Sequence, residues 1–121
     1  MMKIEGEAKL LRIFIGESDK IDHVSVYEKI VIEARKAGLA GATVFKGIMG
    51  FGGSSVIHTA KVLRLSEELP LIIEIVDDIT KIQNFIPVLD EIFEKADAGG
   101  LITIEAAEII KYTANKNRPA K

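Results

Sequence analysis

The chain has 121 residues, of which 48% are hydrophobic and 28% are charged, proportions typical of one globular domain. A formal net charge of −2 gives no general attraction for nucleic acid, and no apolar stretch approaches the roughly 18 residues of a membrane span. The absence of cysteine excludes disulfides, thiolate metal sites and cysteine nucleophiles. Because the first residues also lack a signal-peptide core, we expect a cytoplasmic protein that binds no nucleic acid and does not insert into a membrane.

The first part of the chain predicts a strand followed by a helix. Residues 8–15 are rich in branched and aromatic side chains, which favour a strand. The spacing of Ser25 and Glu28 matches a capping box, in which each side chain bonds the backbone of the other residue. Apolar residues follow at helical spacing until Gly38, which is well placed to end a helix. We therefore expect a helix at residues 26–37.

Two further strands are predicted in the middle of the chain. One covers residues 43–49, and the other covers residues 71–76, where branched residues follow Pro70. Residues 56–68 lie between them and have no place in a minimal fold, so they are expected to form an insertion.

A second helix is predicted after the third strand. Thr80 and Gln83 match another capping box, and the apolar stripe that follows contains Pro87, which predicts a kink or a late helix start. Asp77 and Asp78 precede this helix. Carboxylates suit the positive end of a helix dipole, and this interpretation is favoured over a metal site.

A fourth strand at residues 101–104 completes the order βαββαβ. This order is typical of the ferredoxin-like α+β sandwich, in which an antiparallel sheet of strand order 4-1-3-2 carries both helices on one face. We expect one domain at residues 1–112. A flexible basic tail is expected at residues 113–121, where the composition shifts to small, polar and basic residues.

The second face of this sheet is predicted to be a subunit interface. Alternation within the strands assigns to it Leu10, Arg12, Phe14, Val44, Lys46, Ile48, Ile72, Glu74 and Val76. Glu74 is expected to pair with both Arg12 and Lys46 across the ladder. A lone monomer rarely exposes so many large apolar groups together, so the face is expected to be covered by other copies or, alternatively, by residues 56–68.

The segment at residues 46–55 carries the strongest sign of function. Gly47, Gly50, Gly52 and Gly53 fall within seven positions, and two serines follow. Consecutive N–H groups in such a loop can bind an anion, often a phosphate, but a flexible connector fits the spacing equally well. The segment matches no known nucleotide fingerprint, and no arrangement of residues in the chain indicates an enzyme.

Short segments between residues 8 and 112 resemble the PII nitrogen-signalling proteins, and more closely their uncharacterised PII-like relatives with a short loop. The segments are GFG at 50–52, IHTA at 57–60, LSEELP at 65–70, EIVD at 74–77 and GLIT at 100–103. The resemblance implies a homotrimer whose open sheet faces line a central core. It also implies that adenine nucleotides bind in the clefts between subunits, that no catalysis occurs and that no cofactor is required.

The resemblance also implies which residues bind the nucleotide. They are Gly50, Phe51, Gly52, Gly53, Ser54, Ser55 and His58, then Gly99 and Gly100, and finally Lys111. Two PII cations are missing, one before the last strand and one at Thr113, and each lost charge-assisted contact is worth roughly 1.5–3 kcal/mol. ADP or AMP is therefore expected rather than ATP. A regulatory target, either a membrane transporter or an enzyme, is expected to contact the loop.

Two other functions are compatible with this fold. One is a divalent-cation-binding trimer similar to the copper-tolerance relatives of PII, with His58, Asp77 and Asp78 as ligands; the absence of cysteine disfavours a soft-metal site. The other is a hydrolase of acylphosphatase type, which needs an arginine after the first strand. Residues 16–19 read GESD instead, and their acidic side chains would repel phosphate. His23 is expected in a solvated loop.

Overall fold

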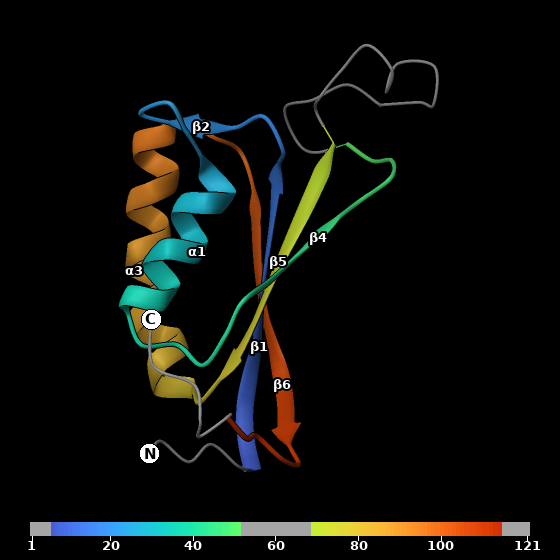
Figure 1. Cartoon of the computed structure of the whole chain (residues 1–121), viewed down its shortest axis with the longest axis vertical. Helices are drawn as coiled ribbons and strands as arrows, with labels where there is room; N and C mark the ends of the chain where they lie inside the picture. The colour runs from blue at the N-terminus through green and yellow to red at the C-terminus, as the bar shows by residue number, and fades with distance from the viewer. Residues whose placement is uncertain (1–5, 52–68, 115–121) are drawn as a thin grey trace.

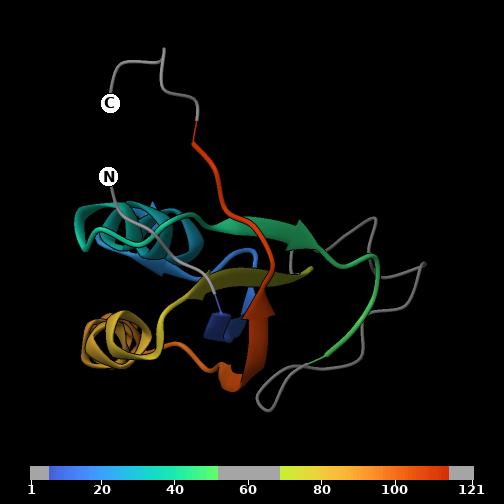
Figure 2. The ribbon, with the colours of Figure 1, turned by 90° about the horizontal axis from the view of Figure 1, so that it is seen from below.

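A computed structural model describes residues 6–51 and 69–114 of the chain. Its elements are β1 (Gly6–Gly16), β2 (Lys20–Ile21), β3 (Val24–Ser25), α1 (Val26–Lys36), β4 (Thr43–Lys46), β5 (Pro70–Asp77), α3 (Ile79–Ala96) and β6 (Leu101–Ile109). Both helices lie on the same face of the main sheet, and the opposite face carries no element among the described residues (Figures 1 and 2). The predicted insertion at residues 56–68 lies outside the described residues.

The main sheet has the order β4-β5-β1-β6 with every neighbouring pair antiparallel, which confirms the predicted ferredoxin-like topology. β4 is shorter than predicted because the β5 residue after its last partner, Leu71, is Pro70, which has no N–H to offer a ladder. β6 is longer than predicted. Its second half reads EAAEI, which favours strands weakly, but it pairs with β1 as far as Gly6↔Ile109.

The core lies between the helices and one face of β1 and β5, as alternation within these strands predicts. The residues that β1 and β5 contribute to this hydrophobic core are Leu11, Ile13, Ile15, Leu71, Ile73 and Ile75. The helices contribute Val26, Ile30, Ala34, Ile82, Phe85, Leu89 and Ile92. The opposite faces of β1 and β5 therefore point away from the helices.

The two ends of α1 differ in how far they follow the prediction. Ser25 is the N-cap residue, but its side chain makes no capping hydrogen bond, so the predicted capping box is wrong. At the other end Gly38 has φ +81°, and its N–H bonds the carbonyl of Arg35 while Leu39 N bonds Ala34 O. These two bonds form a Schellman motif, which confirms Gly38 as the terminating residue.

Helix α3 begins two residues earlier than its predicted capping box implies. Its N-cap is Asp78, whose Oδ1 accepts from Lys81 N at 2.9 Å, so the capping box at Thr80 is wrong and the favoured role of Asp78 at the helix start is confirmed. The helix continues through Pro87, which excludes a late start. Among the helices of the described residues, none is both long and apolar enough to cross a membrane.

The segment before α1 is a small hairpin rather than an open loop. Lys20–Ile21 pairs with Val24–Ser25, and the two residues between them, Asp22 and His23, have φ values of 49° and 70°. Positive φ at both central residues is the requirement of a type I′ turn. Both turn residues are exposed, as predicted for His23.

Candidate functional site

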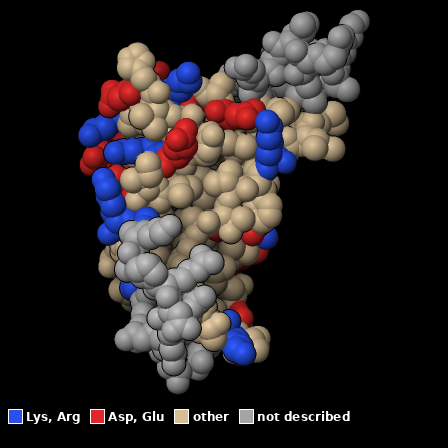
Figure 3. Space-filling view, viewed as in Figure 1, with Lys and Arg blue, Asp and Glu red and all other residues tan. Residues whose placement is uncertain are grey.

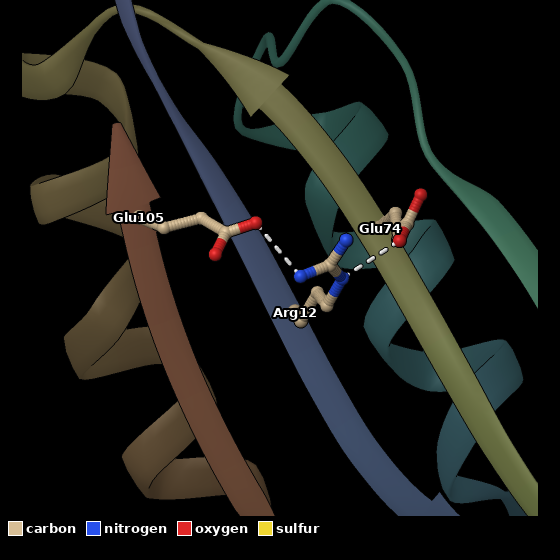
Figure 4. A network of polar contacts seen from close by, with 3 residues as sticks. All are labelled: Arg12, Glu74 and Glu105. Carbon is tan, nitrogen blue, oxygen red and sulfur yellow. Dashed lines mark hydrogen bonds and ion pairs between the residues drawn. The ribbon is translucent and has the colours of Figure 1, made fainter. Parts of the chain in front are cut away.

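The open face of the sheet has a charged group at its centre. The side chain of Arg12 on β1 donates from Nε to Glu74 Oε2 on β5 and from Nη1 to Glu105 Oε1 on β6, each over 2.8 Å (Figure 4). The hydrogen bond to Glu74 raises the pKa of Arg12 above its ordinary value, although partial burial opposes this rise. The predicted pairing of Arg12 with Glu74 is confirmed.

The residues that β4 places on the open face are not the predicted ones. Its register places Thr43 opposite Glu74, and directly opposite residues of an antiparallel pair point to the same side. Thr43 and Phe45 therefore share the open face, whereas Val44 and Lys46 point to the side of the helices. A register that differs by one residue exchanges the two faces of a strand, so the assignment of Val44 and Lys46 is wrong.

The third charge of the group is consequently Glu105 rather than Lys46. Lys46 Nζ lies 2.9 Å from Glu17 Oε2, so its predicted pairing with Glu74 is wrong. Glu105 was missed because the fourth strand was predicted to end at residue 104. Continuing that strand with its period of two from Leu101 would have placed Glu105 on the open face.

Apolar side chains surround the charged group. Half-buried residues on this face are Leu10, Phe14 and Ile72, and exposed ones are Phe45, Val76 and Leu101. In the view of Figure 3, charged side chains gather over the helices, on the other side of the sheet from its open face. Such a combination of large apolar groups is uncommon on the surface of a lone monomer.

Two glycines of the predicted binding loop have a packing reason to be glycine. A Cβ on Gly47 would lie 2.7 Å from Pro70 Cγ, and one on Gly50 would lie 3.2 Å from the same atom. Phe51 follows and is exposed. The other predicted loop residues, Gly52, Gly53, Ser54, Ser55 and His58, lie outside the described residues.

Gly100, before the last strand, is also required by close packing. A Cβ there would lie 2.9 Å from the carbonyl oxygen of Phe14 and 3.0 Å from Cζ of Phe93. Gly99 beside it is exposed. The backbone of this turn therefore crosses the end of β1 at a distance that only glycine allows.

A single chain does not bring together the predicted site residues that the structure describes. Gly47 N bonds Pro70 O, and Leu101 pairs with Phe14, so the loops of Gly50 and Gly100 lie at one end of the sheet. Lys111 follows the far end of β6. The nine residues of β6 span roughly 27 Å, too far for one small ligand to contact both ends.

A hollow of about 340 Å³ lies beside the start of β4, at the end of the sheet that carries Lys111. It is lined by Ala40, Gly41, Ala42, Thr43, Glu74, Val76, Ile109, Lys111 and Tyr112. Figure 2 shows the segment after β6 crossing this end of the sheet toward β4. Of these lining residues, the predicted nucleotide site included only Lys111, because the others meet through strand pairing and share no motif.

The backbone of Ala40 is held from two directions at this hollow. Asp77, which is fully buried, accepts from Ala40 N at its Oδ2 over 2.9 Å and from Asp78 N at its Oδ1 over 2.7 Å. The hydroxyl of Tyr112 donates to Ala40 O over 3.3 Å. The wall of the hollow is thus tied to the end of β5 and to the segment after β6.

These contacts leave little support for a cation site at Asp77 and Asp78. Both oxygens of Asp77 and one oxygen of Asp78 already accept backbone N–H groups. His58, the third proposed ligand, is not among the described residues. Within residues 6–51 and 69–114, no group of three or more histidine, aspartate or glutamate side chains could hold a metal ion.

One protein-family model matches nearly the whole of the predicted domain. Residues 8–109 match the model of DUF190, described as "Uncharacterized ACR". A UPF0166 protein from Aquifex aeolicus is 40% identical over 102 residues, which cover 84% of this chain and 92% of that protein.

Solved structures similar to this one include two of CPII from Thiomonas intermedia K12, a nitrogen regulatory PII-like protein. The structure of CPII bound to ADP and bicarbonate has a TM-score of 0.65 at 15% identity and covers 92% of this chain and 95% of that chain. The structure bound to ADP, AMP and bicarbonate has a TM-score of 0.63 at 14% identity, with coverages of 88% and 97%. At such identities the likeness shows the fold, which is PII-like.

Proposed function

The chain belongs to the DUF190 family and has a PII-like fold, and from this premise we propose that it is a trimeric regulatory protein that binds ADP or AMP between its subunits. The observation that carries the proposal is the hollow beside Lys111, at the edge of an apolar sheet face that no described element covers. CPII, which has the same fold, binds ADP and AMP.

The open face supports the assembly. Its apolar residues surround the Arg12–Glu74–Glu105 group, and contact with a second and third copy would remove them from water. Burial of apolar surface is favourable by about 25 cal/mol per Å². The charges at the centre add a condition on how the copies align, because one guanidinium faces two carboxylates and a misaligned copy would bury the excess negative charge without a counter-charge.

A site between subunits would join residues that one chain keeps apart. The hollow of one copy supplies Lys111 and Tyr112, while the turns that contain Gly50 and Gly99–Gly100 lie at the other end of the sheet. In the assembly that we propose, these turns come from the neighbouring copy and present backbone N–H groups to the phosphates.

The charges around the hollow favour a ligand with few phosphates. Among the described residues that line it, Lys111 is the one cation, and Glu74 contributes a carboxylate. One ammonium group suits a mono- or diphosphate better than a triphosphate, since each further charge would meet no counter-charge. We therefore propose ADP and AMP as ligands and no catalysis.

We propose that ligand binding controls a regulatory target through the glycine-rich segment at residues 46–55. In our proposal the nucleotide orders the loop, and the ordered loop contacts a transporter or an enzyme as its target in the cytoplasm.

Calorimetric titration with ADP, AMP and ATP tests the ligand. We expect ADP to bind and Lys111→Ala to weaken it roughly 10- to 150-fold, the loss of one charge-assisted contact. Lys95→Ala is the matched control, because Lys95 is an exposed lysine of α3 paired with Glu91 and does not line the hollow. Absence of binding by the unaltered protein, or equal effects of the two variants, would refute the site.

Sedimentation at micromolar concentration tests the assembly. Leu101→Glu places a charge on the open face and is expected to give monomers. Ile32→Glu changes a residue on α1 that is similarly exposed, 48% against 55% for Leu101, and should leave a trimer. A monomeric unaltered protein would contradict the proposal.

A further inference from the structure

We infer that Asp77 and Tyr112 are positioning residues for the hollow, holding the backbone of Ala40 at its N–H and at its carbonyl so that ligand binding is coupled to the segment after β6. The inference rests on the proposed function for the identity of the ligand. The contacts themselves are independent of any ligand.

Asp77 sets the position of the Ala40 N–H. Its carboxylate is fully buried and uses one oxygen for Ala40 and the other for Asp78, the N-cap of α3. One side chain thus joins the start of a helix to the wall of the hollow. An asparagine at this position could accept a hydrogen bond from only one of these two N–H groups. Its NH₂ group, which is a donor, would face the other N–H group.

Tyr112 sets the position of the Ala40 carbonyl. It lies in the segment after β6, lines the hollow, and reaches Ala40 O with its hydroxyl. Ala40 and Tyr112 are 72 residues apart in sequence, so this hydrogen bond joins two distant parts of the chain at the wall of the hollow.

A further hydrogen bond joins the segment before β4, which contains Gly38 and Ala40, to helix α3. Lys81 Nζ on α3 donates to the carbonyl of Gly38 over 3.1 Å. The backbone from Gly38 to Ala40 is therefore fixed by α3, β5 and the segment after β6 before it enters β4. A ligand in the hollow would meet a wall that is already in place, which lowers the ordering cost of binding.

The first experiment compares ADP binding by Tyr112→Phe and Tyr27→Phe. Tyr112→Phe keeps the ring and removes the hydroxyl, and we expect the Kd to rise about 2- to 12-fold, the worth of one hydrogen bond. Tyr27 packs against the core on α1, away from the hollow, and its variant should bind as the unaltered protein does. Equal Kd values for Tyr112→Phe and the unaltered protein would overturn the role of Tyr112.

The second experiment needs no nucleotide. The exchange rate of the Ala40 amide, measured by NMR, should rise about 2- to 12-fold in Tyr112→Phe, while amides within α1 keep their rates. Asp77→Asn should raise the rate further where it folds. An unchanged exchange rate of the Ala40 amide in Tyr112→Phe refutes the coupling even if ADP binds. A raised exchange rate in a protein that binds no ADP supports the hold of Tyr112 on Ala40 and refutes the proposed ligand.

Discussion

Three glycines of this chain should differ in their response to alanine, because the space around an added Cβ and the backbone conformation differ at each. Gly100→Ala forces a Cβ to within 2.9 Å of the Phe14 carbonyl oxygen, a backbone atom that cannot turn away. Gly38→Ala strains the left-handed residue that ends α1 at φ +81°. At Gly41 nothing lies within 4 Å of an added Cβ and φ is not positive.

The magnitudes follow from these contacts. Overpacking at Gly100 should cost about 1–3 kcal/mol, and a left-handed alanine at Gly38 about 1–2 kcal/mol. Gly41→Ala should stabilise by about 0.4–1 kcal/mol, because it restricts only the unfolded chain. With an unfolding entropy of about 250 cal/mol/K for 121 residues, each kcal/mol moves Tm by about 4 °C.

Thermal unfolding at one protein concentration, followed by circular dichroism, measures all three. We expect Tm to fall by about 4–12 °C for Gly100→Ala, to fall by about 4–8 °C for Gly38→Ala and to rise by about 2–4 °C for Gly41→Ala. If Gly100→Ala kept the original Tm and lost only nucleotide binding, Gly100 would be a ligand residue and the packing argument would be refuted.

Three smaller effects can be measured in the same way. His23→Gly relieves the strain of a positive φ in the β2–β3 turn and should stabilise the protein by about 0.5–1 kcal/mol. Asp97→Gly should stabilise it by a similar amount at the end of α3, where φ is 52°. A loss of stability in either variant would contradict these backbone conformations. Burial acts to raise the pKa of Glu33, but the hydrogen bond and charge of Lys29, with Lys36, outweigh it and lower the pKa. Glu33→Gln should therefore cost at most about 0.5 kcal/mol at pH 7, and this cost should vanish as the pH falls below the ordinary glutamate range near 4.3; a cost that persists in acid would show that packing, not charge, is lost.

The order of the two helices and the four strands of the main sheet, the pairing order of these strands and the buried face of β1 and β5 follow from the sequence alone. Alternation in a single strand and the spacing of apolar residues along a helix are local properties, and they identified Leu11, Ile13 and Ile75 as core residues without knowledge of their partners. The pairing of Arg12 with Glu74 could be predicted for the same reason, since both strands are long and regular.

The register of the short β4 and the full length of β6 were decided only by the tertiary structure. In the short β4, period-two alternation gives two sets of residues but does not say which set faces the helices. The pairing of Thr43 with Glu74 decided this. The same holds for Glu105, which entered the charged group because β6 pairs with the full length of β1. The hollow and the double hold on Ala40 depend on residues up to 72 positions apart, and such contacts arise from packing, which no local pattern encodes.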